Sequence, residues 1–159
     1  MENISLEVLA GELLRRHGSW LSVAESCSGG LLGHRITNVP GSSDYFMGGV
    51  IAYDNQIKMR LLGVRSDTLE EHGAVSREAV LEMAQGVRAA LQADIGLSVS
   101  GIAGPGGGTV EKPVGLVWIG LSAPGFEDAW SYTWAGDRLQ VKEQTAEQAL
   151  RILVGYLGD

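Results

Sequence analysis

The hydrophobic and polar positions of the chain alternate between helical and strand spacing. Apolar residues that recur every three or four positions predict helices, whereas short apolar runs between turn residues predict strands. The predicted helices cover residues 4–18, 31–39, 54–63, 76–93 and 137–153, with a short turn or helix at 65–72. The predicted strands cover residues 20–24, 48–53, 95–100, 115–122 and 129–135. This alternation favours an α/β fold in which helices cover both faces of one mixed sheet.

Two of the predicted strands carry more detailed expectations. The strand at 48–53, GGVIAY, is short, apolar and flanked by glycines, so we expect it to be buried. The strands at 115–122 and 129–135 follow each other without a helix between them, and Pro124-Gly125 is a turn signal. We therefore expect a hairpin there, which makes part of the sheet antiparallel.

Length and charge narrow the class of protein. A chain of 159 residues fits a single domain spanning residues 1–159. The formal net charge is −7 and no basic cluster is longer than Arg15-Arg16, so nucleic acid is not an expected partner. No apolar run approaches the roughly 18 residues of a membrane span, and the acidic start is unlike a signal peptide, so no membrane partner is expected. The single Cys27 excludes an internal disulfide and leaves the reducing cytoplasm as the expected location.

The segment 21–32, LSVAESCSGGLL, predicts a strand, a tight turn and a helix in close succession. The first backbone N–H groups of such a helix have no partner within it and would face the small hydroxyl groups of the turn. This arrangement suits a nucleophile beside an anion or oxyanion site. It also suits a plain helix cap, because serine is a preferred N-cap residue, and the turn alone favours the cap.

A second loop places Lys58 one turn into a predicted helix that Asp54 or Asn55 can cap. Burial and the positive end of the helix dipole both disfavour the ammonium form, so they would lower the pKa of Lys58. A neutral Lys58 close to Tyr53 would be a general base. The alternative is a solvated lysine that pairs with Asp54 or Glu70.

A third loop, GIAGPGGGTVEKP at 101–113, could present backbone N–H groups to a phosphate or a ribose. It lacks the lysine of a P-loop and the helix of a dinucleotide-binding fingerprint, so a tight connection is an equal alternative. Arg138 is a candidate anion clamp, or a surface ion pair with Asp137. Because sites in α/β sheets collect outside the carboxyl ends of strands, we expect the three loops to meet in one cleft.

Other chemistries are less favoured by the sequence. His17, His34 and His72 are scattered and lack ligand spacing with Cys27, so neither a metal site nor a cofactor is predicted. The turn around Ser26 is not G-x-S-x-G. Cys27 stays open as a nucleophile, although a buried unreactive thiol is the favoured interpretation.

Six motifs, taken in order, resemble those of the CinA C-terminal domain family, which includes stand-alone nicotinamide-nucleotide amidases. They are AESCSGG at 24–30, PGSS at 40–43, GGVIAYDNQIKMRLLGV at 48–64, HGAVS at 72–76, SGIAGPGGGTVEKPVG at 100–115 and GDR at 136–138. The resemblance implies a three-layer α/β/α sandwich that forms a homodimer. It also implies hydrolysis of a small-molecule nucleotide, nicotinamide mononucleotide, to nicotinate mononucleotide and ammonia without a metal.

The resemblance further implies roles for individual residues. It makes Ser26 the nucleophile, Lys58 its base and Tyr53 a third catalytic residue. Substrate-binding positions are implied at Ser28, Gly29, Gly30, Asn55, Ser100, Gly101, Gly104, Gly106 and Arg138. In the mechanism that follows, neutral Lys58 takes the Ser26 proton directly or through Tyr53, and N–H groups around residues 28–30 stabilise the oxyanion.

One departure from the family pattern and two other functions stay open. Asp54 stands where the family more often has serine, and a carboxylate near Lys58 would favour the ammonium form unless it turns to solvent as a cap. The other functions are a non-catalytic nucleotide-binding or regulatory module and an amidase acting on another nucleotide-like carboxamide. The intact trio of Ser26, Tyr53 and Lys58 weighs against the binding module.

Overall fold

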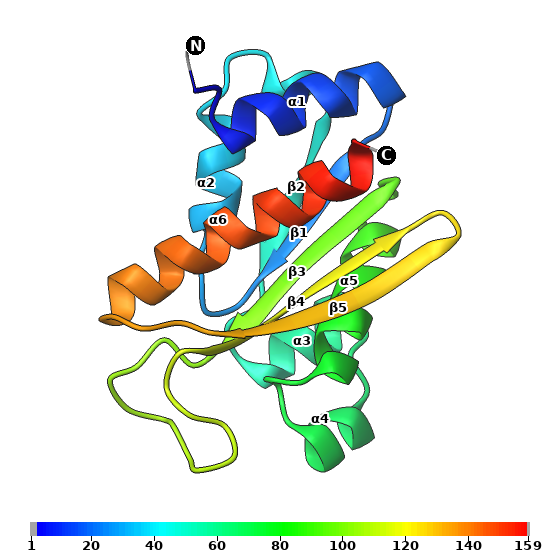
Figure 1. Cartoon of the computed structure of the whole chain (residues 1–159). Coiled ribbons are helices and arrows are strands. Elements are labelled where there is room, and N and C mark those ends of the chain that lie inside the picture. Colours follow the sequence, from blue (N-terminus) through cyan, green and yellow to red (C-terminus); the bar gives the residue numbers. More distant parts are fainter. Residues whose placement is uncertain (1–2, 159) are drawn as a thin grey trace.

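The structure, a computed structural model that describes residues 3–158, is a single α/β domain built on one five-stranded sheet in the order β2-β1-β3-β4-β5 (Figure 1). The strands are β1 (Leu21–Glu25), β2 (Phe46–Ile51), β3 (Ile95–Gly101), β4 (Leu116–Ala123) and β5 (Phe126–Thr133). The helices are α1 (Leu6–His17), α2 (Leu31–Thr37), α3 (Asn55–Leu62), α4 (Ser66–His72), α5 (Arg77–Ala90) and α6 (Arg138–Leu157), with a 3-10 turn, η1, at Ser42–Asp44. β2, β1 and β3 run parallel, whereas β4 and β5 are antiparallel to their neighbours, so the expected mixed sheet is confirmed.

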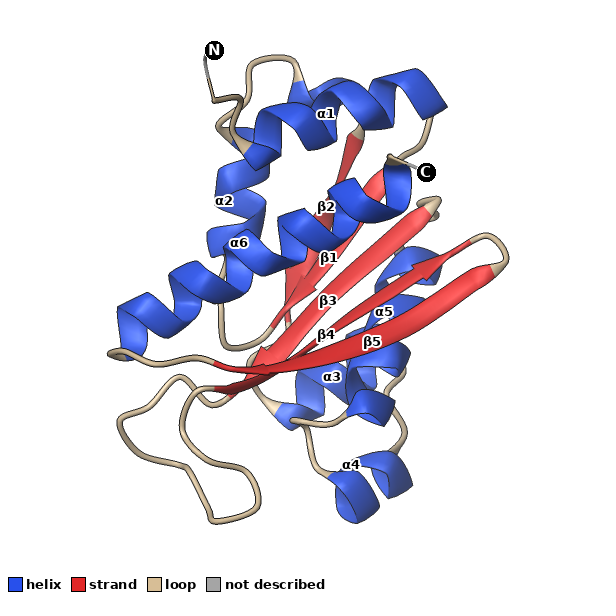
Figure 2. Ribbon diagram, viewed as in Figure 1, coloured by secondary structure: helices blue, strands red, loops and turns tan. Residues whose placement is uncertain are grey.

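Helices cover both faces of the sheet and make three layers (Figure 2). α1, α2 and α6 lie on one face, where their apolar stripes pack on inward side chains of β1, β3 and β4 such as Val23, Leu97 and Ile119. α3, α4 and α5 lie on the other face, where Val80 and Met83 of α5 form the centre of a second apolar cluster. The α/β/α sandwich implied by the resemblance is therefore confirmed, and apolar burial on both faces holds the sheet in place.

The position and burial of β2 differ from the expectation. The strand covers Phe46–Ile51 instead of 48–53, and its residues alternate between half-buried and exposed. It is an edge strand that pairs with β1 alone, so it is not enclosed as a central parallel strand would be. Gly48 and Gly49 lie inside the strand. Position 49 needs glycine, because a Cβ there would stand 2.6 Å from Val23 Cγ2 and 2.9 Å from the Val23 carbonyl oxygen. They permit close packing on β1 and do not mark a strand end.

The hairpin between the last two strands is confirmed. β4 ends at Ala123 and β5 begins at Phe126, so Pro124-Gly125 forms the whole connection. Gly125 has φ +71°, a conformation that suits glycine in a tight turn. β5 therefore begins three residues before the predicted start at residue 129, because the short turn lets pairing with β4 start at once.

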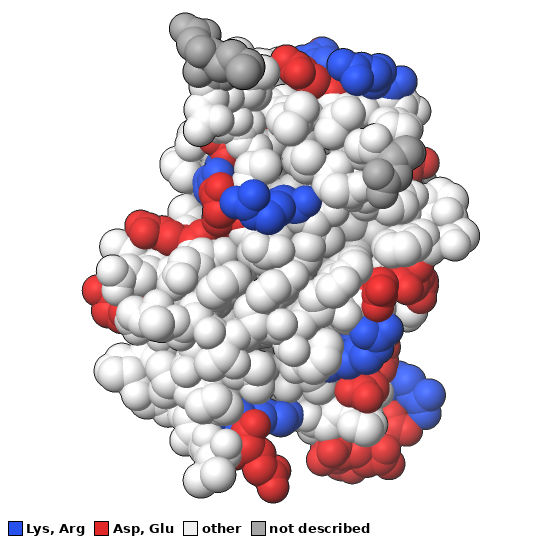
Figure 3. Space-filling model, in the orientation of Figure 1, with Lys and Arg blue, Asp and Glu red and all other residues white. Residues whose placement is uncertain are grey.

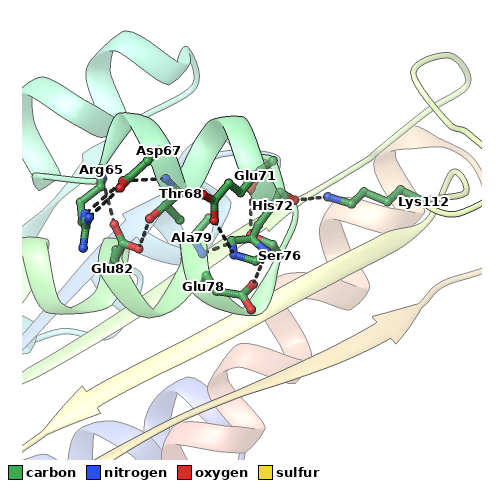
Figure 4. A network of polar contacts seen from close by, with 11 residues as sticks. Arg65, Asp67, Thr68, Glu71, His72, Ser76, Glu78, Ala79, Glu82 and Lys112 are labelled. Carbon is green, nitrogen blue, oxygen red and sulfur yellow. Dashed lines mark hydrogen bonds and ion pairs between the residues drawn. The ribbon is translucent and has the colours of Figure 1, made fainter.

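The parallel arrangement brings the three predicted loops to the same edge of the sheet. β1, β2 and β3 end at Glu25, Ile51 and Gly101, and the loops that carry the candidate residues follow directly. The glycine-rich loop after β3 is held at its far end by Lys112, whose Nζ donates to the carbonyl oxygen of His72 at the end of α4 (Figure 4). The loop therefore spans from the carboxyl end of β3 to the α4 side of the molecule.

The surface and the helices give two further observations. On the face shown in Figure 3, uncharged side chains form a broad area across the middle of the molecule, with charged side chains above it and along its edges. Among residues 3–158, no helix combines the length and the apolar character needed to cross a membrane.

Candidate active site

The turn after β1 is organised around the buried carboxylate of Glu25. Its oxygens accept hydrogen bonds from the Ser28 hydroxyl (2.6 Å) and from the backbone N–H groups of Gly30 (3.2 Å), Leu32 (2.9 Å) and Gly33 (2.9 Å). Negative charge is favoured at a helix start, where N–H groups lack partners within the helix. Glu25 thus occupies the start of α2 from inside the protein. The anion site that the sequence predicts at this helix is already filled by the protein's own carboxylate.

Ser26 lies at the head of this turn. Its backbone N–H donates to the Val99 carbonyl oxygen of β3 (3.1 Å), which fixes the turn against the neighbouring strand. The N-cap residue of α2 is Gly30, and the N–H groups at the helix start donate to Glu25 and not to Ser26. The helix-cap interpretation of Ser26 is therefore wrong. Its hydroxyl instead faces a lysine, because Ser26 Oγ lies 3.1 Å from Lys58 Nζ.

Lys58 is almost completely buried, with only 1% of its surface exposed. Its Nζ also donates to the backbone carbonyl oxygen of Tyr53 (3.0 Å). The side chain of Asp54 caps α3 by accepting from the Gln56 N–H (2.8 Å), so it serves the helix start instead of pairing with Lys58. The solvated lysine paired with Asp54 or Glu70 is therefore the wrong interpretation.

Burial sets the protonation of Lys58. Removal from water lowers the pKa of its ammonium below the usual value, and the negative charge of Asp54 acts in the opposite direction. Desolvation dominates, so the neutral amine is more accessible here than in a solvated lysine. A neutral amine in contact with a serine hydroxyl can accept its proton.

Tyr53 and Arg138 form the opposite side of the site. Tyr53 is 64% exposed as a residue, and its hydroxyl accepts a hydrogen bond from Arg138 Nη2 (3.0 Å). Arg138 Nη1 donates to the Gly104 carbonyl oxygen (2.7 Å), which links α6 to the glycine-rich loop. Asp137 caps α6 together with Gln140, so the surface ion pair between Asp137 and Arg138 is not formed. Lys58 contacts Ser26 directly, whereas the Tyr53 hydroxyl is bonded to Arg138.

Tyr53, Arg138 and the glycine-rich loop border a cleft of about 240 Å³ at the carboxyl ends of the parallel strands, and neither Ser26 nor Lys58 is part of its lining. It is lined by Cys27, Tyr53, Gly101, Ile102, Ala103, Gly104, Gly106, Gly107 and Arg138. The three loops therefore meet in one cleft, as expected. Five predicted substrate-binding residues are not part of its lining. Ser28, Gly29 and Gly30 lie in the turn after β1, Ser100 is buried within β3, and Asn55 lies exposed at the first position of α3.

Cys27 lines the cleft but is an unfavourable nucleophile. Its side chain is buried, and burial raises the pKa of the thiol to about 12. The thiolate is the reactive form of cysteine, so almost none is present near neutral pH. The favoured interpretation of an unreactive thiol agrees with this environment.

Some backbone N–H groups of the turn after β1 donate to an acceptor within the described part of the chain, whereas others are open, meaning that they have no acceptor there. The Gly29 N–H donates to the Ser26 carbonyl oxygen (3.2 Å), and the Gly30 N–H donates to Glu25. Within residues 3–158, the N–H groups of Cys27 and Ser28 have no hydrogen-bond acceptor. The donors expected from the amides of Gly29 and Gly30 are thus engaged inside the turn, whereas the two amides directly after Ser26 are open.

Two side chains at this site, those of Glu25 and Lys142, have no role in the sequence prediction. Glu25 was not assigned a role, although a carboxylate just before a predicted helix start is a recognisable signal. Lys142 was also not assigned, although it follows Arg138 by one helical turn on α6 and reaches the same turn as Ser26. In the part of the chain that the structure describes, no three His, Cys, Asp or Glu side chains gather into a metal-binding group.

The fold and the site together define a class: an α/β/α sandwich with a buried serine–lysine pair at the carboxyl ends of parallel strands. The chain belongs to the CinA C-terminal domain family, whose model matches residues 3–157. It is 51% identical over 164 residues to a CinA-like protein of Nostoc sp.. The aligned region covers 96% of this chain and 39% of that protein. The chain thus spans about two fifths of the length of the curated relatives it matches.

Solved structures extend the similarity to the whole fold. A competence-damaged protein (CinA) superfamily protein from Klebsiella pneumoniae superposes with a TM-score of 0.93 at 32% identity, covering 96% of both chains. A competence or damage-inducible protein from Enterobacter asburiae gives a TM-score of 0.92 at 33% identity, covering 98% of this chain and 99% of the other. These proteins share the size of this chain, in contrast to the longer curated relatives.

Proposed function

We propose that this protein hydrolyses the carboxamide of nicotinamide mononucleotide to nicotinate mononucleotide and ammonia. The observation that carries the proposal is the 3.1 Å contact between Ser26 Oγ and Lys58 Nζ, made by a lysine whose pKa is lowered by burial. A serine next to a neutral amine is an activated nucleophile of the kind that acyl transfer requires. The choice of nucleotide follows the resemblance to nicotinamide-nucleotide amidases.

In the first half of the reaction, Ser26 Oγ attacks the amide carbon while its proton passes to Lys58 Nζ. The carbonyl oxygen gains negative charge in the tetrahedral intermediate, and the open N–H groups of Cys27 and Ser28 are the donors available to it. The C–N bond then breaks, Lys58 gives its proton to the leaving nitrogen, and ammonia departs. An ester between Ser26 and the acyl group remains.

In the second half, water attacks the ester carbon and Lys58 takes a proton from it. The bond between the acyl carbon and Ser26 Oγ breaks, and the proton on Lys58 returns to the serine. The carboxylic acid product ionises in solution, and the enzyme regains its starting state. Lys58 thus acts as general base and general acid in both halves.

Substrate placement in this proposal uses the rest of the cleft. The backbone of the loop from Gly101 to Gly107 lines one wall. Arg138 joins that loop to the Tyr53 hydroxyl, so one side chain fixes two walls of the cleft relative to each other. This arrangement positions a nucleotide against Ser26, because rigid walls restrict the approach of the amide carbon.

The experiment is ammonia release from nicotinamide mononucleotide by the purified protein without added metal. We expect Ser26→Ala to lower the rate by about 10³-fold or more, because the nucleophile is lost. Cys27→Ser is the matched control at the next position and should keep most of the activity. A folded Ser26→Ala protein that keeps substantial activity would contradict the proposal. A wild-type protein that binds the nucleotide without releasing ammonia would favour a binding module.

A further inference from the structure

α6 brings a second cation to the turn that carries Ser26. Lys142 follows Arg138 by one helical turn, so both side chains leave α6 on the same side. The Nζ of Lys142 lies 3.4 Å from the position that a Cβ on Gly29 would occupy. Its charge also acts on the thiol of Cys27, a residue that lines the cleft. Lys142 therefore lies against the turn that carries Ser26, close to Cys27 in the lining of the cleft.

The three lysines of the sequence differ in their partners. Lys58 contacts Ser26 and the Tyr53 carbonyl oxygen, and Lys112 donates to the His72 carbonyl oxygen. Lys142 has neither a hydrogen bond nor an ion pair with any residue from 3 to 158, although its side chain is only half-exposed. A partly buried ammonium without an acceptor is costly unless a ligand supplies one.

The surrounding charges leave this cation available. Glu25, the carboxylate beneath the turn, already accepts four hydrogen bonds from the turn and α2. Arg138 directs its two terminal nitrogens to the Gly104 carbonyl oxygen and the Tyr53 hydroxyl. Arg138 is thus engaged in holding the walls of the cleft. Lys142 is the cation at this edge that still lacks an acceptor among the described residues.

We propose that Lys142 binds the phosphate group of the nucleotide substrate, while Arg138 holds the cleft in shape. This inference rests on the proposed function and adds to it the group that recognises the phosphate monoester. A lysine ammonium is a compact point charge that suits a phosphate. The reacting end already has Lys58 and the two open amides, so an additional cation is needed most at the anionic end of the substrate.

The test compares two ligands that differ only in the phosphate: nicotinamide mononucleotide and nicotinamide riboside. Calorimetric titration is carried out on the Ser26→Ala protein, which prevents turnover, with and without Lys142→Ala. We expect Lys142→Ala to weaken binding of the mononucleotide about tenfold, as for loss of one hydrogen bond to a charged group. Binding of the riboside should stay unchanged, and Lys142→Arg should restore most of the affinity for the mononucleotide.

Arg151→Ala is the matched control, because it removes one positive charge from the same helix and should leave both affinities unchanged. Equal loss for both ligands would place Lys142 at the shared part of the substrate and overturn the inference. Unchanged binding of the mononucleotide, or its failure to bind the Ser26→Ala protein at all, would also overturn it. The proposed function is tested separately, because it fails when the wild-type protein releases no ammonia.

Discussion

Lys58 is the residue on which the proposed chemistry depends most. It must be neutral to accept the Ser26 proton, and burial lowers its pKa in that direction. The rate constant kcat/KM should therefore rise with pH as Lys58 loses its proton. The nearby carboxylate of Asp54 works against this by favouring the ammonium form.

Asp54→Asn isolates that effect. Asparagine is as good an N-cap residue as aspartate, so α3 should keep its start while the negative charge is lost. Because Asp54 raises the pKa of Lys58, its removal should move the rising limb of the kcat/KM profile to lower pH. Glu70→Gln, an exposed change on α4, is the control and should leave the profile in place. An unmoved or upward-shifted limb in Asp54→Asn would contradict neutral Lys58 as the base.

Single residues also show what the sequence could and could not predict. Spacing placed Lys58 one turn into α3, and the structure brings its Nζ to the hydroxyl of Ser26, while its role as a base stays a prediction. Spacing alone favoured a solvated lysine, because burial depends on how α3 packs beneath the β1 turn. The hydrogen bond between the Tyr53 hydroxyl and Arg138 was not predictable from local patterns. The two residues are 85 positions apart in the sequence, and only the packing of α6 brings them together.

At the scale of elements, Glu25 connects β1 to α2. It gathers four donors from residues 28–33, so it holds the turn that presents Ser26. Glu25→Gln keeps the shape but replaces one acceptor oxygen by a donor that faces N–H groups. We expect the free energy of unfolding to fall by roughly 2–4 kcal/mol and kcat to fall about tenfold or more, because Ser26 is displaced.

Urea unfolding and the ammonia assay measure both effects of Glu25→Gln. Glu12→Gln, an exposed change on α1, is the control and should alter neither. Full stability together with wild-type kcat in Glu25→Gln would show that the buried carboxylate does not organise the turn.

The elements themselves were predicted well where local signals decide them. The α5 helix starts at a serine cap, Ser76, whose hydroxyl accepts from the Ala79 N–H as its sequence pattern indicates. The start of β2 was wrong by two residues because Gly48 and Gly49 look like a boundary. Gly49 instead allows the edge strand to pack closely against Val23 of β1. This contact depends on the tertiary structure, so local sequence patterns do not predict it.

At the scale of the whole molecule, the two apolar clusters share one sheet. Leu150 on α6 and Met83 on α5 are fully buried on opposite faces. Leu150→Ala and Met83→Ala should each lower the free energy of unfolding by about 2–5 kcal/mol, and each variant should still unfold in one transition. Leu139→Ala, an exposed position on α6, should change it by less than about 0.5 kcal/mol.

Urea unfolding followed by both circular dichroism and tryptophan fluorescence checks this expectation. Two separate transitions would contradict a single cooperative unit built around one sheet. The homodimer implied by the resemblance stays a prediction, and a dependence of the unfolding midpoint on protein concentration would support it.

The central claim is that Ser26 forms an ester with the acyl group of the substrate. The most direct measurement is turnover of nicotinamide mononucleotide in the presence of hydroxylamine, which attacks such an ester in competition with water. The account predicts a hydroxamic acid product that rises with hydroxylamine concentration while ammonia release continues, and neither product from the Ser26→Ala protein. Ammonia release without any hydroxamic acid, or hydroxamic acid formed equally by Ser26→Ala, would contradict the serine ester.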